Sequence, residues 1–301
     1  MWPGFNPDTN FLLDTLRHYA SPPLVFHGSL YPSSAPSLPP DMAIVGPYSE
    51  NWRVLPSSLP KVYFSAENWS LPTGMDADAF SLYLLSSPDP SNPRHFRLPT
   101  WMTFIDWFTD RSTLPPPSTD NPIRLPLHFA THPHPVPFTN RAEFCAFVVS
   151  NPTQTFRNEA YQALHAYKKV NSGGALYNNI GGPLALLYPG GGGGDLSKHA
   201  FFAKHRFTLS AENSQCRGYI TEKVLHAKMA GCVPLYWGDS QTDEDFAPHS
   251  IVNLSHLTCP ADIVGIVKRL EARPEFCARI AATPLLDKEK TDKAQIGRAH
   301  V

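Results

Sequence analysis

The stretch FTLSAENSQCRGYITEKVLHAKMAGCVPLYWG, residues 207–238, decides how the fold of this chain is read. Its apolar start, Phe207–Ser210, predicts a strand, and a polar loop follows it. A helix is predicted from Thr221, whose hydroxyl can accept an N–H group of the first turn. Gly231 suits the left-handed residue that ends a helix, and Val233–Trp237 then predicts a buried parallel strand. The stretch is therefore one βαβ unit with polar side chains collected at the start of its helix.

Size and composition indicate an ordinary folded protein. The 301 residues are enough for two domains, and 42% hydrophobic with 17% charged residues favours packed cores over disorder. The net charge of -1 gives no reason to expect nucleic acid or an acidic membrane as a partner. No apolar run approaches the ~20 residues that span a bilayer. The five cysteines lack C-x-x-C spacing, and their odd number argues against a full disulfide framework.

The first half of the chain is rich in proline and predicts short elements with irregular connections. These are a helix over Asn10–Tyr19, strands over Met42–Val45, Lys61–Ser65 and Phe80–Leu85, an aromatic helix over Thr100–Phe108, and a linker over Leu114–Pro137. Glu67 follows the second of these strands, at the carboxyl end where open α/β sheets place ligand groups. We expect an α/β domain over residues 1–138 whose first strand is absent, because the chain starts almost at a helix.

The second half predicts another open α/β domain, over residues 139–295. Besides the opening stretch, its elements are a strand over Phe144–Ser150, a helix over Phe156–Lys169, a glycine- and asparagine-rich loop over Asn171–Gly182, a strand over Ile251–Leu254 and a helix over Ala261–Glu271. Residues 296–301, IGRAHV, match the translation of a sequencing adapter, so we exclude them from the fold prediction.

Three charged residues are candidates for chemistry. Arg157 and Lys223 fall in the first turns of predicted helices, where free N–H groups and a partial positive charge suit phosphate. A guanidinium can also bind two oxygens at once, so the pair could hold a pyrophosphate. The alternative is that both are solvated surface charges. Glu67 could act as a general base across a cleft, or it could simply cap a neighbouring helix.

Metal sites are not predicted. The acid pairs Asp76/Asp78 and Asp243/Asp245 resemble metal-binding pairs in form only, and such pairs are common in loops. The thirteen histidines do not fall at metal-ligand spacing. The expectation is therefore a site that uses neither a metal nor a cofactor.

Two segments of the opening stretch, AENSQCRGYITEK (211–223) and AGCVPLYWGD (230–239), resemble the signature of the α-1,3-fucosyltransferases, glycosyltransferase family 10. The pattern is long and specific, and further segments resemble the family in the same order along the chain. They are WPGFNP (2–7), VYFSAENWSLP (62–72), RHFRLPTW (94–101), FCAFVVSNP (144–152), FRNEAYQAL (156–164) and NSGGALYNNIGG (171–182).

The resemblance implies a GT-B fold, in which two Rossmann-like domains face a cleft. The first domain would take the glycan acceptor and the second GDP-fucose, with inverting transfer of L-fucose from GDP-β-L-fucose to a hydroxyl of an N-acetylglucosamine or glucose unit. By the same resemblance, Glu67 matches the general base, and Arg157 and Lys223 match the cations that hold the pyrophosphate. The remaining matches, which line the nucleotide, its ribose or the fucose, are Asn213, Tyr219 and Glu222.

Departures from the family pattern leave alternatives open. Ala66 stands where the family commonly has glycine, and Ala211 where it commonly has an aromatic residue. One alternative is a truncated or degenerate protein that binds a GDP-sugar or a carbohydrate without turnover, and another is a different nucleotide-sugar donor. The compartment is open too: cytoplasmic if the start is of the bacterial type, Golgi membrane or lumen if an N-terminal anchor precedes it.

Overall fold

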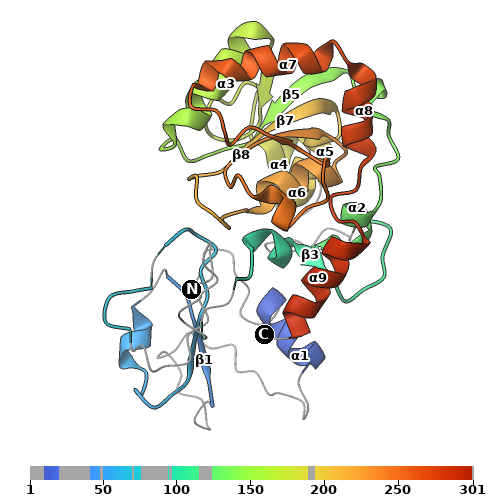
Figure 1. Cartoon of the computed structure of the whole chain (residues 1–301). Helices are drawn as coiled ribbons and strands as arrows, with labels where there is room; N and C mark the ends of the chain where they lie inside the picture. Colours follow the sequence, from blue (N-terminus) through green and yellow to red (C-terminus); the bar gives the residue numbers. More distant parts are fainter. Residues whose placement is uncertain are drawn as a thin grey trace.

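A computed structural model describes residues 10–19, 41–47, 50–69, 71–75, 94, 97–114, 124–188 and 194–299. Figure 1 shows a larger body built on one sheet and a smaller part that carries β1 and α1. The predicted strand Phe80–Leu85 and the acid pair Asp76/Asp78 lie outside the described residues. So do the WPGFNP segment and most of the run of glycines at residues 190–194.

The larger body contains a five-stranded sheet in which all neighbouring strands are parallel. In spatial order the strands are β6 (Val170–Ser172), β5 (Glu143–Phe147), β7 (His205–Ala211), β8 (Val233–Trp237) and β9 (Val252–Asn253). The predicted strand Val233–Trp237 is confirmed to the residue. Parallel sheets are covered on both faces, which is why this strand reads as an unbroken apolar run.

Helices cover both faces of this sheet. One face packs against α3 (Thr155–Tyr167), α7 (Ile263–Glu271) and α8 (Pro274–Ala282), and the other against α4 (Leu184–Leu187), α5 (Gly194–Phe202) and α6 (Glu222–Met229) (Figure 1). Alternation within the strands supplies both layers: Phe207, Leu209 and Ala211 join the first, whereas Ala146 and Tyr236 join the second. The sequence missed α4, α5 and α8.

The smaller part differs from its prediction in two places. Its elements are α1 (Phe11–Tyr19), the parallel pair β1 (Ala43–Val45) and β2 (Lys61–Tyr63), η2 (Thr100–Phe104), the parallel pair β3 (Ile105–Asp106) and β4 (Leu125–Pro126), and α2 (His128–Thr131). The predicted helix Thr100–Phe108 is wrong, because η2 is one 3₁₀ segment that passes into β3. The predicted linker Leu114–Pro137 is wrong over its described second part, because β4 and α2 lie within it and Leu125 is fully buried.

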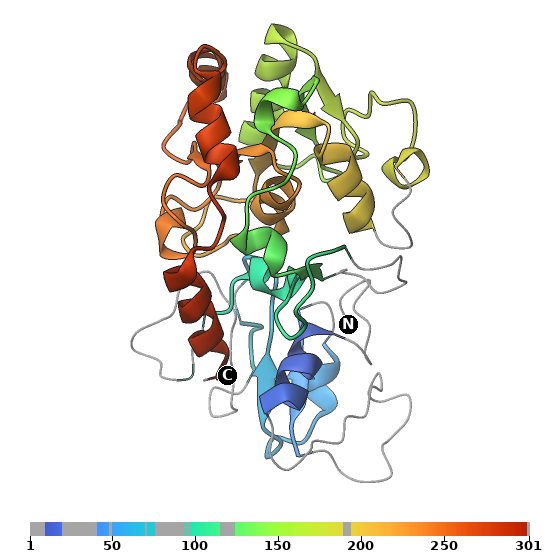
Figure 2. The ribbon, with the colours of Figure 1, turned by 90° about the vertical axis from the view of Figure 1, so that its right-hand side faces the viewer.

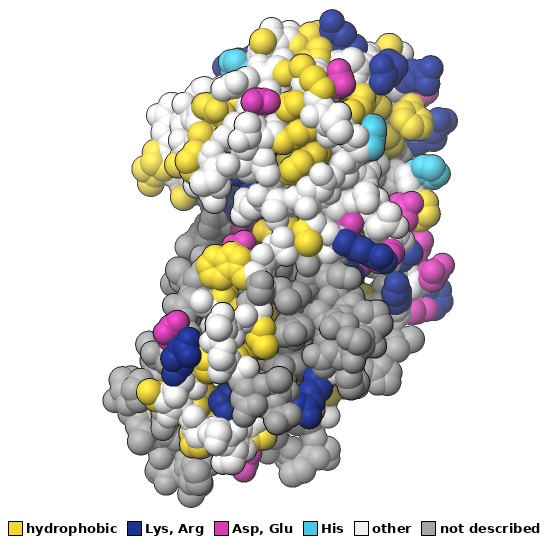
Figure 3. Space-filling view, turned by 60° about the vertical axis from the view of Figure 1, so that its left-hand side comes forward, with side chains coloured by type: hydrophobic (Ala, Val, Ile, Leu, Met, Phe, Trp, Pro, Cys, Tyr) yellow, Lys and Arg dark blue, Asp and Glu magenta, His cyan; other side chains and the backbone are white. Residues whose placement is uncertain are grey.

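The remaining elements are short or terminal. They are η1 (Asn51–Val54), η3 (Phe138–Asn140), η4 (Thr242–Glu244), η5 (Pro260–Asp262) and α9 (Lys288–Ala299). Figure 2 shows α9 running from the larger body toward the smaller part. Figure 3 shows acidic and basic side chains beside one another at several places on one face, in keeping with the small net charge. No helix within the described residues combines the length and the apolar character that crossing a bilayer requires.

The two parts of the molecule share one hydrophobic core. Phe11, Trp101 and Ile105 from the smaller part are buried together with Val224 of α6 and with Phe246. The rings of Trp101 and Phe246 lie 5.1 Å apart between centroids. This shared core sets the position of the smaller part against the start of α6, where the candidate site residues lie.

Helix α6 ends as the sequence predicts. Gly231 has φ +78°, its N–H donates to the Lys228 carbonyl at 2.8 Å, and the Cys232 N–H donates to the Ala227 carbonyl at 3.1 Å. These two bonds form a Schellman motif, which needs a left-handed residue after the helix. A Cβ atom at this position would also come within 2.2 Å of Nη2 of Arg141.

We therefore expect Gly231→Ala to lower the free energy of unfolding by roughly 2 kcal/mol, through both the backbone strain and the clash. The measurement is urea denaturation followed by circular dichroism. Gly265→Ala is the matched control, because Gly265 lies inside α7 and a Cβ atom there would have its nearest contact at 3.7 Å. The control should gain about 0.5–1 kcal/mol, as alanine does in helices. Equal effects at the two positions would contradict the account.

Candidate active site

The strand order of the sheet reverses between β5 and β7. Strand β6 lies on one side of β5, whereas β7, β8 and β9 extend from its other side. Open α/β sheets bind ligands beyond the carboxyl ends of their strands at such a switch point. Arg157 follows β5 in the first turn of α3, and Asn213 follows β7. They meet across the switch point, where Nη1 of Arg157 donates to Oδ1 of Asn213 at 2.7 Å.

Arg157 is fully buried, so it is not a solvated surface charge. Its Nη2 donates to the Asn151 carbonyl at 2.6 Å, and its Nε has no hydrogen-bond partner among the described residues. Burial lowers the pKa of the guanidinium, while nearby Glu212 and Tyr219 act in the opposite direction. Because arginine keeps its proton in proteins, the switch point holds a fixed positive charge.

Lys223 supplies a second cation at the start of α6. Its Nζ lies 2.9 Å from Oε2 of Glu212 and 2.8 Å from Oγ1 of Thr221, and its side chain is 18% exposed. Burial alone would lower the pKa of Lys223, but Glu212 and Glu222 outweigh it and raise that pKa. The amine is therefore charged at neutral pH, and only its edge faces solvent.

Glu212 organises the helix start, a role that the sequence did not reveal. Its carboxylate is fully buried at the end of β7, where Oε1 accepts the Thr221 N–H at 2.7 Å and Oε2 accepts the Thr221 hydroxyl at 2.6 Å. The predicted capping role of Thr221 is wrong, because its hydroxyl donates to this carboxylate and caps no first-turn N–H. A buried carboxylate is the stronger hydrogen-bond acceptor. The available signal was an acid directly after a predicted buried strand.

Glu222 occupies the first position of α6. Burial alone would raise the pKa of its carboxyl, but Lys223 and Lys198 outweigh burial and lower that pKa to about 2. The residue is therefore negatively charged across the neutral range. A carboxylate in the first turn is also stabilised by the helix dipole.

Glu67 reaches the same place from the smaller part. It lies just beyond β2 and is partly buried, and the Tyr219 hydroxyl donates to its Oε2 at 3.1 Å. Next to it, Nδ2 of Asn68 donates to Oγ of Ser214 at 3.4 Å. Burial, followed by Glu212 and Glu67, raises the pKa of Tyr219, so this phenol stays protonated as a donor. The carboxylate thus contacts the loop between β7 and α6 and caps no described helix.

Arg97 of the smaller part contacts both that loop and Asp245. Arg97 donates through Nη1 and Nη2 to the two oxygens of Asp245 at 2.7 and 2.6 Å, and Nη2 also donates to the Gly218 carbonyl at 3.2 Å. Nε1 of Trp101 donates to the same carboxylate at 3.1 Å. Asp245 therefore serves as an anchor, which excludes it from the metal-pair interpretation of Asp243 and Asp245. The sequence analysis missed Arg97, because it lies 148 positions before its partner Asp245.

Removing Glu212 should destabilise the protein strongly. We expect Glu212→Ala to cost about 3–5 kcal/mol, because it leaves Lys223 without its buried partner. Glu212→Gln should cost less, since an amide oxygen can still accept from Thr221. The measurement is chemical denaturation monitored by tryptophan fluorescence.

Glu244→Gln is the matched control, because Glu244 pairs with Arg217 at an exposed site, at 2.9 Å with side chains 44% and 65% exposed. Exposed pairs contribute ~0–1 kcal/mol. A cost for Glu212→Ala no greater than that of the control would refute the role given to Glu212.

Comparison with solved structures confirms the fold class. A crystal structure of α1,3-fucosyltransferase with GDP superposes with a TM-score of 0.61 at 21% sequence identity, covering 89% of this chain and 80% of that chain. A crystal structure of α1,3-fucosyltransferase with GDP-fucose gives a TM-score of 0.61 at 19% identity, covering 99% and 98%. At such identities the likeness concerns the fold, which is α/β of the GT-B type.

Curated relatives align with part of the chain. The α-(1,3)-fucosyltransferase FucT of Helicobacter pylori is 32% identical over 127 residues, which are 42% of this chain and 24% of that protein. The GDP-fucose protein O-fucosyltransferase 3 of Mus musculus is 32% identical over 120 residues, which are 38% of this chain and 24% of that protein. The chain thus spans about a quarter of the length of these relatives.

The second half of the chain resembles a known protein family. Residues 138–279 match the family described as "Glycosyltransferase family 10 (fucosyltransferase) C-term". This segment contains the whole five-stranded sheet as well as Arg157, Asn213 and Lys223. Over residues 138–279 the chain is therefore similar to glycosyltransferase family 10, the fucosyltransferases.

Proposed function

We propose that this chain is an inverting fucosyltransferase, which moves L-fucose from GDP-β-L-fucose to a hydroxyl of an N-acetylglucosamine or glucose unit in an α-1,3 linkage. One observation carries the proposal: Glu67 meets Tyr219 on the loop whose two ends hold Asn213 and Lys223. The proposed base would thus contact the same loop that runs between Asn213 and the proposed cation Lys223. The names of two relatives, an α-(1,3)-fucosyltransferase and a GDP-fucose protein O-fucosyltransferase, support GDP-fucose as the donor.

The donor side would lie at the switch point, in residues 139–295. Arg157 and Lys223 would hold the pyrophosphate of GDP-fucose and stabilise the negative charge that grows on it as the bond to the sugar breaks. Asn213, Tyr219 and Glu222 would line the nucleotide, its ribose or the fucose. Two fixed cations can take up the phosphate charge, so we propose a reaction without a metal or cofactor.

The acceptor side would lie in residues 1–138, with Glu67 as general base. One oxygen of Glu67 accepts from the neutral Tyr219 phenol, which orients the carboxylate and leaves the other oxygen for substrate. Glu67 would take the proton of the acceptor hydroxyl while the oxygen of that hydroxyl forms a bond to C1 of fucose. The C1–O bond to GDP breaks on the opposite face, so the electron pair leaves with the β-phosphate and the configuration inverts.

The test is GDP release from GDP-β-L-fucose with N-acetyllactosamine as acceptor, with product configuration read by NMR. We expect Arg157→Ala and Lys223→Ala each to lower kcat by roughly 10²–10³-fold, as removal of a charge-stabilising group does. Glu67→Gln should lower it by about 10²–10⁴-fold. Addition of EDTA should leave the rate unchanged.

Lys168→Ala is the matched control, because Lys168 forms a partly exposed ion pair with Glu271 beyond the far end of α3. It should keep the wild-type rate. GDP binding without turnover on any acceptor would contradict the proposal and favour a non-catalytic GDP-sugar-binding protein. Competition by UDP as strong as that by GDP would contradict the choice of donor.

A further inference from the structure

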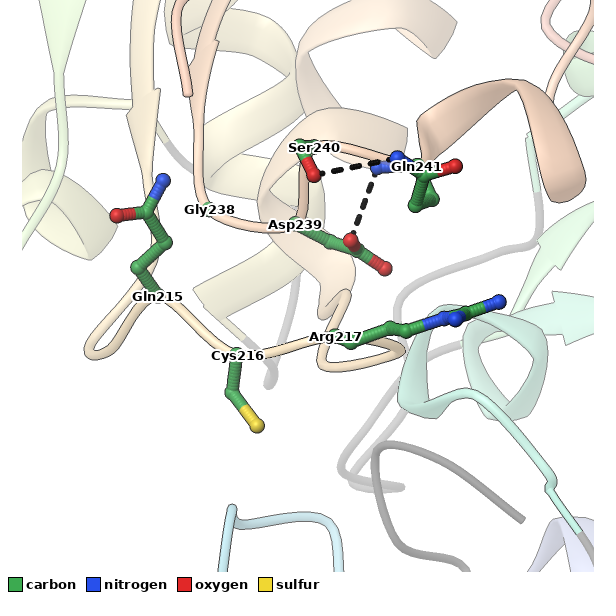
Figure 4. Close-up of a pocket in the computed structure, with 7 residues that line it drawn as sticks. All are labelled: Gln215, Cys216, Arg217, Gly238, Asp239, Ser240 and Gln241. Atoms are coloured by element: carbon green, nitrogen blue, oxygen red, sulfur yellow. Dashed lines mark hydrogen bonds between the residues drawn. The ribbon is translucent and has the colours of Figure 1, made fainter. Parts of the chain in front are cut away.

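A polar hollow lies between the loops that follow β7 and β8. It has a volume of about 400 Å³ and is lined by residues 215–217 and 238–241 (Figure 4). This volume falls at the lower end of the ~300–1,000 Å³ typical of small-molecule sites. The switch point lies on the other side of β7, so the hollow is separate from the pair formed by Arg157 and Asn213.

Hydrogen bonds hold the two walls of the hollow together. Oδ2 of Asp239 accepts the Gly218 N–H at 2.5 Å, and its Oδ1 accepts the Gln241 N–H at 2.9 Å. Nε2 of Gln215 donates to the Ser255 carbonyl, and Oγ of Ser255 accepts the Gly238 N–H at 3.1 Å. The hollow is therefore formed before any ligand arrives, which lowers the entropic cost of binding.

The hollow adjoins the proposed base. Residues 215–217, which form one wall of the hollow, lie between Ser214 and Tyr219 in the loop. Ser214 contacts Asn68, and Tyr219 contacts Glu67. A ligand in the hollow would thus approach Glu67 from the β8 side, whereas Arg157 lies on the β5 side. Single displacement needs the acceptor and the leaving group on opposite sides of the sugar carbon.

The lining suits a sugar better than a nucleotide. Gln215 and Gln241 carry amides that both donate and accept, as vicinal hydroxyl groups require, and Ser240 adds a hydroxyl. Among the described lining residues Arg217 is the only cation, and it is paired with Glu244 at 2.9 Å. Asp239 adds a negative charge, so phosphate is not favoured. The seven described lining residues include no aromatic ring on which a base could stack.

We propose that this hollow binds the pyranose ring of the acceptor, with the side chains of Gln215, Arg217 and Gln241 as its contacts. The proposal rests on the proposed function, and it assigns part of acceptor recognition to the donor-side half of the chain. Arg217 is 65% exposed on its side chain, so its guanidinium can contact a ligand while Glu244 holds it in place.

The test measures N-acetyllactosamine binding by saturation-transfer NMR in the absence of donor, and GDP-fucose binding by calorimetry. We expect Arg217→Ala and Gln241→Ala each to weaken acceptor binding about tenfold, the effect of losing one or two hydrogen bonds, and to leave GDP-fucose affinity unchanged. Ser240→Trp, at an exposed position, should block the hollow and abolish acceptor binding. Lys168→Ala, which removes a partly exposed ion pair with Glu271 away from the hollow, should bind the acceptor like the wild type. Circular dichroism confirms that each variant is folded.

Each contrary result is distinct. Absence of acceptor binding to the wild type, or unchanged binding in all three hollow variants, would overturn the proposal. If these variants lose GDP-fucose affinity but keep acceptor affinity, the hollow is a donor site and the proposal is also overturned. Acceptor binding that depends on the hollow, without any transfer, would support this proposal and refute only the proposed function.

Discussion

The buried carboxylate of Glu212 is the interaction on which the rest of the site depends. It accepts from the backbone and hydroxyl of Thr221 and pairs with Lys223, and its own side chain is fully buried. Breaking such a group away from its partners is far more costly than breaking a surface pair. The end of β7, the start of α6 and the second cation therefore form one rigid unit, as preorganised charge stabilisation requires.

A second constraint places the two halves of the chain against each other. Trp101 and Phe246 belong to one core, and Arg97 and Asp245 form a two-pronged ion pair at its edge. Both contacts converge on the loop that carries Tyr219, since Arg97 also holds the Gly218 carbonyl. The position of the proposed base relative to the cations is thus set by packing around this loop.

Much of the second half of the chain could be predicted from the sequence. Buried parallel strands are continuous apolar runs, so Val233–Trp237 was found to the residue, and the helix stop needed a glycine at position 231. Polar residues after strand ends meet at one edge of a sheet, which is why Arg157 and Asn213 come together. The partners of Glu212 and Arg97 could not be predicted, because tertiary contacts over many positions decide them. The same applies to Thr100–Phe104, whose aromatic side chains fit a shared core in 3₁₀ geometry.

The central claim is that the two halves of the chain have separate roles in the proposed reaction. Arg157 and Lys223 would hold the donor, and Glu67 from the other half would activate the acceptor. The most direct measurement is calorimetric GDP affinity, taken beside single-turnover transfer, for Glu67→Gln and Arg157→Ala. The account predicts that Glu67→Gln binds GDP like the wild type and transfers almost no fucose, whereas Arg157→Ala loses GDP affinity. Equal loss of GDP affinity in both variants, or full transfer by Glu67→Gln, would contradict it.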